Sequence, residues 1–86
     1  MRFEILVPVV AEDGRDRWFR AERRAPCVSD DVWARWAGFT LRRASARPAV
    51  GGGVQILTEA LGASMVGALR ENGFSEVCDP TVDAAS

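Results

Sequence analysis

Residues 2–24, RFEILVPVVAEDGRDRWFRAERR, contain the pattern that decides the predicted fold. The odd positions from Phe3 to Val9 are all apolar, and this alternation is typical of a strand with one buried face. Asp13-Gly14 then predicts a tight turn, because glycine adopts the positive φ that such turns require. A return strand is expected over residues 15–24. The stretch therefore predicts an antiparallel β-hairpin.

The register of this hairpin has two alternatives. A two-residue loop would place Val9 opposite Trp18. A three-residue loop would align the apolar residues of the two strands more completely, but it would also set Glu4 opposite Glu22, and opposing like charges are destabilising. Both registers stay open on the sequence alone. Pro8 has no amide hydrogen to donate, which favours an edge position for the first strand.

A short helix is expected after the hairpin, over residues 30–37. Ser29 is a suitable N-cap, and the two aspartates that follow it favour the positive end of the helix dipole. Trp33 and Trp36 lie on one side of this helix, and burying each would cover about 150–250 Å² of surface. We therefore expect both tryptophans in the core.

The segment that follows has two interpretations. Residues 39–43, FTLRR, form either a third short strand or a continuation of the helix, and the strand is favoured. Residues 44–53, ASARPAVGGG, have the composition of a loop, with a proline and three successive glycines.

The segment 54–72 predicts a long helix that ends at a glycine cap. Its apolar stripe consists of Leu57, Leu61, Met65, Ala68 and Leu69. Gly73 is placed for a left-handed C-cap, and Phe74 after it is expected to contact Leu69. A last short strand is expected over residues 75–78.

These elements predict a small α+β domain over residues 1–78, followed by a disordered tail over residues 79–86. The expected order is an N-terminal hairpin, a short helix, a third strand and a long C-terminal helix packed on one face of the sheet. The other face or the sheet edge would then be available to a partner, including a second copy of the chain.

The residue types that are missing exclude several kinds of chemistry. The chain has no histidine and no lysine, so all 11 basic residues are arginine. This removes Ser-His and Cys-His nucleophile pairs, Schiff-base lysines and the lysine of a phosphate-binding loop. Cys27 and Cys78 are too few for a zinc site without histidine. We therefore predict a protein that is not an enzyme, with no catalytic residues, no cofactor and no metal.

The candidate functional residues lie in and beyond the return strand RDRWFRAERR, residues 15–24. Arginine and tryptophan are concentrated at the hot spots of protein interfaces. The same residues could contact phosphates and stack a base, or could form a solvated strand face whose arginines pair with nearby carboxylates. A second basic cluster at residues 42–43 would enlarge the surface if the sheet brought it alongside. The predicted partner-binding residues are Arg15, Arg17, Trp18, Arg20, Arg23, Arg24, Arg42 and Arg43.

A net charge of −1 argues against a general nucleic-acid binder. In size, expected single-domain build and lack of catalytic residues, the chain resembles the accessory proteins with which bacteriophages and mobile elements block host complexes, anti-CRISPR inhibitors among them. The resemblance implies a protein-binding inhibitor, and the alternative is a small DNA- or RNA-binding regulator that uses the arginine-rich hairpin. The sequence shows neither a secretory signal nor a stretch of about 18 apolar residues, so we expect a cytoplasmic protein that does not bind membranes. A homodimer is a further expectation, because the uncovered face or edge of the sheet could pair with a second copy of the chain.

Overall fold

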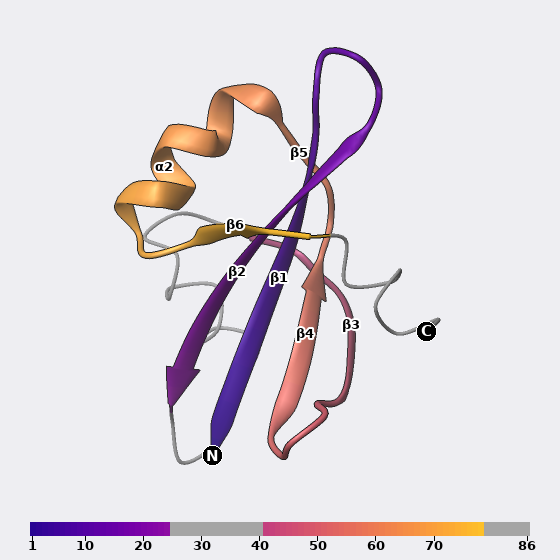
Figure 1. Ribbon diagram of the computed structural model, residues 1–86. Coiled ribbons are helices and arrows are strands. Elements are labelled where there is room, and N and C mark those ends of the chain that lie inside the picture. The colour runs from indigo at the N-terminus through magenta and orange to yellow at the C-terminus, as the bar shows by residue number, and fades with distance from the viewer. Residues whose placement is uncertain (25–40, 79–86) are drawn as a thin grey trace.

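The computed structural model describes residues 1–24 and 41–78 and consists mainly of a mixed β-sheet (Figure 1). The six strands are β1 (Arg2–Val10), β2 (Asp16–Arg24), β3 (Arg43–Pro48), β4 (Val54–Thr58), β5 (Leu61–Gly62) and β6 (Ser75–Val77). Their order is β3-β4-β1-β2-β6, and β5 also pairs with β1. A 3₁₀ turn, η1 (Ala63–Met65), leads into the helix α2 (Val66–Glu71), which lies between β5 and β6 in the chain.

Strands β1 and β2 form the predicted hairpin in the register of the three-residue loop. Val7 lies opposite Phe19, so the apolar residues of the two strands share one face. Ala11 donates its N–H to Arg15 O at 2.9 Å, and Gly14 donates to Ala11 O at 3.0 Å. Gly14 has a φ of +82°, which confirms the turn predicted at this glycine.

Strand β1 lies in the middle of the sheet, so the edge position inferred from Pro8 is wrong. Because Ala11 bonds to Arg15 on the β2 side, strand alternation turns the nitrogen of Pro8 towards β4 and β5. Strand β4 pairs with β1 as far as Leu6, and β5 resumes the pairing at Val9. The missing amide hydrogen of Pro8 therefore falls at the interruption between β4 and β5, where a central strand tolerates it.

The long helix predicted over residues 54–72 is wrong, and so is the α+β architecture built on it. The segment forms β4, β5 and a short helical stretch of three 3₁₀ and six α-helical residues. Its first residues carry β-branched side chains at alternate positions, Val54, Ile56 and Thr58, which suits a strand with one buried face. Ile56 pairs in parallel with Ile5 of β1. The spacing of the apolar residues in this short run also fits a helix, but the long-range pairing with β1 makes the segment a strand.

The predicted end of the helix is confirmed, although the helix is much shorter than expected. Phe74 donates its N–H to Leu69 O at 3.0 Å, and Gly73 donates to Arg70 O at 3.2 Å. Gly73 has a φ of +87°. These are the two hydrogen bonds of a Schellman motif, which stops the helix and directs the chain into the predicted last strand, β6.

The loop predicted over residues 44–53 is in part a strand. Strand β3 pairs antiparallel with β4, and the connecting turn covers only residues 49–53. Gly51, Gly52 and Gly53 all have positive φ, so the glycines reverse the chain within a hairpin. Of the described residues in the third strand expected over residues 39–43, only Arg43 lies in a strand, because Leu41 and Arg42 precede β3. The described residues do not include residues 39 and 40, the helix expected over residues 30–37 or the tail expected over residues 79–86.

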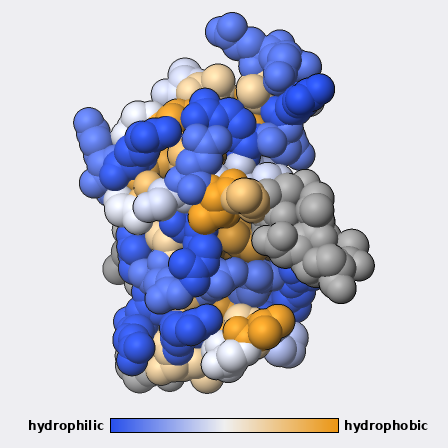
Figure 2. Space-filling model, viewed as in Figure 1, coloured by the Kyte–Doolittle hydropathy of each residue, from blue (hydrophilic) through white to orange (hydrophobic). Residues whose placement is uncertain are grey.

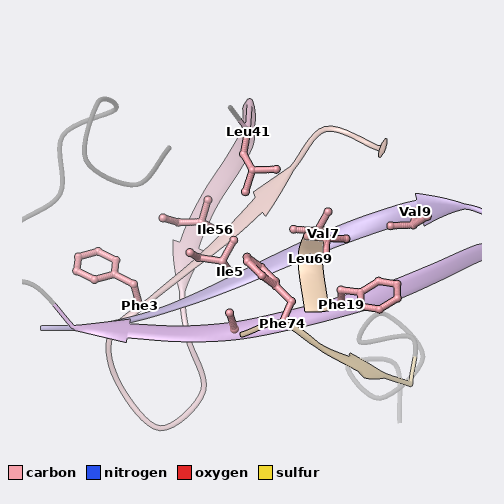
Figure 3. Packing of buried hydrophobic residues seen from close by; sticks show 10 residues of the cluster. Phe3, Ile5, Val7, Val9, Phe19, Leu41, Ile56, Leu69 and Phe74 are labelled. Carbon is pink, nitrogen blue, oxygen red and sulfur yellow. The ribbon is translucent and has the colours of Figure 1, made fainter. Parts of the chain in front are cut away.

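The hydrophobic core lies between one face of the sheet and the helix. Leu69 of α2 is fully buried over this face, and Phe74 after the helix is 3% exposed. The buried cluster comprises Phe3, Ile5, Val7, Val9, Phe19, Ala21, Leu41, Ile56, Leu69 and Phe74 (Figure 3). Most of its members come from the odd positions of β1 and β2, as the sequence pattern predicts.

Candidate functional site

The predicted partner-binding residues of β2 do not share one face of the sheet. Arg17 and Arg23 lie on the same face as the core residue Phe19, whereas Trp18 and Arg20 lie on the opposite face, because side chains alternate along a strand. A run that is continuous in sequence is thus divided between two surfaces of the molecule.

On the helix side, Arg17 binds Glu76 of β6 through two hydrogen bonds. Arg17 Nε lies 2.9 Å from Glu76 Oε2, and Arg17 Nη2 lies 2.7 Å from Oε1. Arg70 approaches the same carboxylate at 3.5 Å, and both guanidinium groups lie over the ring of Phe19, at 5.5 and 5.9 Å from its centroid. The hydrogen bond raises the pKa of Arg17 and lowers the pKa of Glu76. This cluster attaches the short edge strand β6 to β2.

Arg23 links β2 to the end of the helix. Its Nη2 donates to Asn72 O at 2.6 Å, and its Nη1 donates to Glu22 O at 2.8 Å. The guanidinium carbon lies 5.8 Å from the centroid of the Phe74 ring. Helix ends leave carbonyl groups without helical partners, and arginine is well suited to bind them. Arg23 therefore holds the helix terminus against the sheet.

The opposite face of the sheet carries a polar chain of five residues from four strands, which we call the cross-sheet ladder. Arg47 of β3 donates to Gln55 Oε1 of β4, and Gln55 Nε2 donates to Glu4 Oε1 of β1 at 2.7 Å. Arg20 Nε of β2 donates to Glu4 Oε2 at 3.0 Å, and Arg20 Nη2 donates to Glu22. The ladder thus runs Arg47, Gln55, Glu4, Arg20, Glu22.

The ladder resolves the charge conflict that the hairpin register creates. Glu4 lies directly opposite Glu22, and Arg20 binds both carboxylates. Burial lowers the pKa of Arg20, but its hydrogen bonds to Glu22 and Glu4 outweigh this effect and raise it. The hydrogen bond from Arg20 also lowers the pKa of Glu22. Arg20 therefore stabilises this face of the sheet. This agrees with the interpretation of β2 as a strand face whose arginines pair with nearby carboxylates of the same chain.

Trp18 lies on the same face as the ladder and is almost completely buried. The residue is 8% exposed and stands opposite Pro8 of β1 and Val77 of β6. Its indole Nε1 is buried and has no hydrogen-bond partner in the described part of the chain. A tryptophan this deeply buried presents little surface to a partner.

The remaining predicted residues lie far apart. Arg15 and Arg24 are exposed near opposite ends of β2. Arg42 and Arg43 are exposed at β3, on the other edge of the sheet, with β4 and β1 between them and β2. Three strand spacings amount to about 14 Å, so the sheet does not bring the second basic cluster beside the first.

Among the described strands, β3 is the one whose residues are all exposed, and the sequence did not indicate its open outer edge. All six residues of β3 are exposed, and β4 is its sole pairing partner among the described strands. Ala49 donates to Gly53 O at 3.1 Å, so alternation directs the amide of Arg47 towards β4 and that of Ala46 outwards. Pro48 also faces outwards and offers a carbonyl oxygen alone.

The sequence signal for this strand was weak because β3 buries no apolar face. Ala44, Ser45 and Ala46 have small side chains, and without hydrophobic alternation they do not look like a strand. The available signal was indirect. A glycine-rich turn stands between this segment and the alternating residues Val54, Ile56 and Thr58, as in a hairpin with a longer loop.

No protein-family model matches the chain, and no curated protein or solved structure shows significant similarity to it. Across residues 1–24 and 41–78, no helix has the length and apolar character needed to span a membrane. Within those same ranges no three potential metal ligands come together.

Proposed function

We propose that the chain is a non-enzymatic protein-binding module whose partner adds an extended segment to the outer edge of β3. The observation that carries the proposal is the exposure of the whole strand together with the outward amide of Ala46. Unpaired N–H and C=O groups at a sheet edge are ready to bond to another strand, and several peptide-binding domains recognise their ligands in this way.

The surface chemistry supports an edge contact better than a broad hydrophobic one. In the view of Figure 2, hydrophilic residues dominate the surface and hydrophobic residues appear as small areas. Stable apolar interfaces usually need an extended patch, whereas strand addition gains affinity from main-chain hydrogen bonds.

This proposal moves the interface away from the arginines of β2. Arg17 and Arg20 bind carboxylates of the chain itself, and they lie on opposite faces. The same placement gives no support to the nucleic-acid alternative, which needs several arginines directed together towards phosphates. Of the eight predicted residues, Arg42 and Arg43 stay in the proposed site. Binding that blocks a host complex, as in the phage-type inhibitors that the chain resembles in build, would follow from occupation of this edge by a segment of that complex.

A single substitution tests the proposal. Ala46→Pro removes the outward amide and breaks no β3–β4 hydrogen bond, because Ala46 faces away from β4. The control is Glu12→Pro, which places proline at an exposed turn position that accepts it. Both variants and the wild type are used to capture partners from an extract of the source cells. We expect one partner to bind the wild type and Glu12→Pro but not Ala46→Pro. Equal capture by Ala46→Pro, or no partner for the wild type, would contradict the proposal.

A further inference from the structure

We infer that the segment accepted by β3 is acidic. This inference rests on the proposed function, because it specifies the chemistry of the strand that would be added to the same edge. Three arginines lie at this edge, against one neighbouring acidic residue among the described residues, Glu59, whose N–H donates to Arg42 O at 2.7 Å.

The positive charge is concentrated at both ends of the small residues of β3. Arg42 and Arg43 precede Ala44, Arg47 follows Ala46, and all three arginines are exposed. The sequence from residue 41 to residue 58 contains no aspartate or glutamate. Arg47 donates to the neutral amide of Gln55, so this contact leaves its charge uncompensated. Arginines outnumber carboxylates along this segment, with Glu59 beside Arg42, so an approaching strand would meet a net positive charge that is greatest near Arg47.

The arginines reach both faces of the edge because β3 contains a bulge. Arg43 pairs with Thr58, which is buried on the core side, whereas Arg47 pairs with Gln55, which belongs to the cross-sheet ladder on the other side. The register shifts by one residue between Arg43 and Ser45, and such a shift moves the side chains of a strand to the other face. The arginines of this edge thus lie on both of its faces, and Arg47 lies on the face away from the core.

The small side chains between the arginines suit a close approach of backbone to backbone. Ala44, Ser45 and Ala46 leave the main chain uncovered, and Ala46 supplies an outward N–H and C=O. Pro48 has no N–H, so the outward-facing hydrogen-bond donors of β3 end before this residue. The site therefore fits a short extended segment of a few residues.

Charge also decides between an acidic partner and a second copy of the chain. Antiparallel pairing of two β3 strands would bring Arg42, Arg43 and Arg47 of both copies to one seam, where each copy contributes three arginines and one neighbouring carboxylate, that of Glu59. Like charges across a strand pair are destabilising. An acidic segment would instead form charge-assisted contacts with the same arginines.

The experiment uses hexapeptides with blocked ends in which glutamate, glutamine or lysine alternates with threonine, a residue that favours extended backbone. Binding to the whole chain is followed by NMR titration at low salt. We expect the glutamate peptide to bind at least about tenfold more tightly than the glutamine peptide, with shifts centred on Ala46, and the lysine peptide not to bind. Arg42→Gln with Arg47→Gln should remove most of this preference, and added salt should weaken it.

The outcomes separate the two proposals. If the glutamine peptide binds as tightly as the glutamate peptide and Ala46→Pro abolishes both interactions, strand addition stands and the acidic preference is overturned. If Ala46→Pro binds the glutamate peptide as well as the wild type does, strand addition itself is wrong, and the acidic-strand inference is overturned with it. Failure of every peptide to bind, tighter binding of single-stranded DNA at the same residues, or a dimer that Ala46→Pro dissociates would each overturn the inference.

Discussion

Arg20 Nε of β2 lies 3.0 Å from Glu4 Oε2 of β1, and this bond places a positive charge between two carboxylates that the hairpin register sets opposite each other. The hairpin can therefore keep its apolar residues on one face without leaving Glu4 and Glu22 in repulsion. Arg20 is the centre of the cross-sheet ladder, which joins four strands on the face away from the helix.

Replacing Arg20 should measure this contribution. The Glu4 side chain is 14% exposed, so Arg20→Met should lower the free energy of unfolding by about 1–2 kcal/mol as that carboxylate loses its charged partner. Urea denaturation measures the change. Adding Glu22→Gln to Arg20→Met should restore part of the loss, because it removes the repulsion. Arg24→Met, at an exposed strand end, is the control and should change stability by less than about 0.5 kcal/mol. Unchanged stability of Arg20→Met would show that the ladder contributes nothing.

The pair formed by Arg17 and Glu76 predicts a pH dependence. Because Arg17 lowers the pKa of Glu76 below its ordinary value of 4.5, the stabilisation is present above that value and is lost as the pH falls through the lower pKa of the folded state. The Tm of the wild type should exceed that of Glu76→Gln at about pH 7, and the two should converge at about pH 2–3, where Glu76 is protonated in both states. Glu71→Gln controls for the loss of an exposed carboxylate. A difference in Tm that persists in acid would exclude ionisation of Glu76 as its cause.

The β3–β4 turn predicts contrasting effects at two neighbouring glycines. Gly53 has a φ of +85°, and a Cβ at this position would lie 2.2 Å from Arg2 O. Gly52 also has a positive φ, but a Cβ there would meet nothing within 4 Å. Gly52→Ala should therefore cost only backbone strain of about 1–2 kcal/mol. Gly53→Ala should cost clearly more, because the β4 end must also move away from β1. Equal losses in urea denaturation would argue against this close approach.

The helix α2 contains a glycine that can be replaced with a gain in stability. Gly67 lies within this helix, and a Cβ at this position would meet nothing within 4 Å. Gly67→Ala should raise the free energy of unfolding by about 0.5–1 kcal/mol, since alanine has the higher helix propensity. A higher urea midpoint is the expected result. A lower midpoint would mean that the short helix is packed more tightly than its surroundings indicate.

The local features of the fold were predictable because nearby residues determine them. The turn at Gly14 and the helix end at Gly73 each need a positive φ, and glycine at those positions signals it. The alternation from Phe3 to Val9 was sufficient to identify the buried face of β1. These elements match the structure regardless of what surrounds them.

The long-range features were not predictable from spacing alone. Leu57, Leu61, Met65 and Leu69 fit a helical stripe, but the parallel pairing of β4 with β1 places Leu57 on a different face from Ile56 and from the core around Leu69. The choice between strand and helix depended on a partner strand some fifty positions earlier in the chain. For the candidate site, the sequence identified the arginines but not their positions. Their division between the two faces of β2 follows from strand alternation, and the open edge of β3 follows from the sheet order.

The amide hydrogen exchange rate of Ala46 in the uncomplexed chain tests the open β3 edge most directly. Ala46 faces outwards, whereas the amide of its neighbour Arg47 faces β4. We predict that Ala46 exchanges at least about tenfold faster than Arg47, because open strand edges lack the hydrogen bonds that protect amides, and that the glutamate peptide slows Ala46 selectively. Protection of Ala46 equal to that of Arg47 in the uncomplexed chain would show that the edge is already covered and would contradict the proposed open edge.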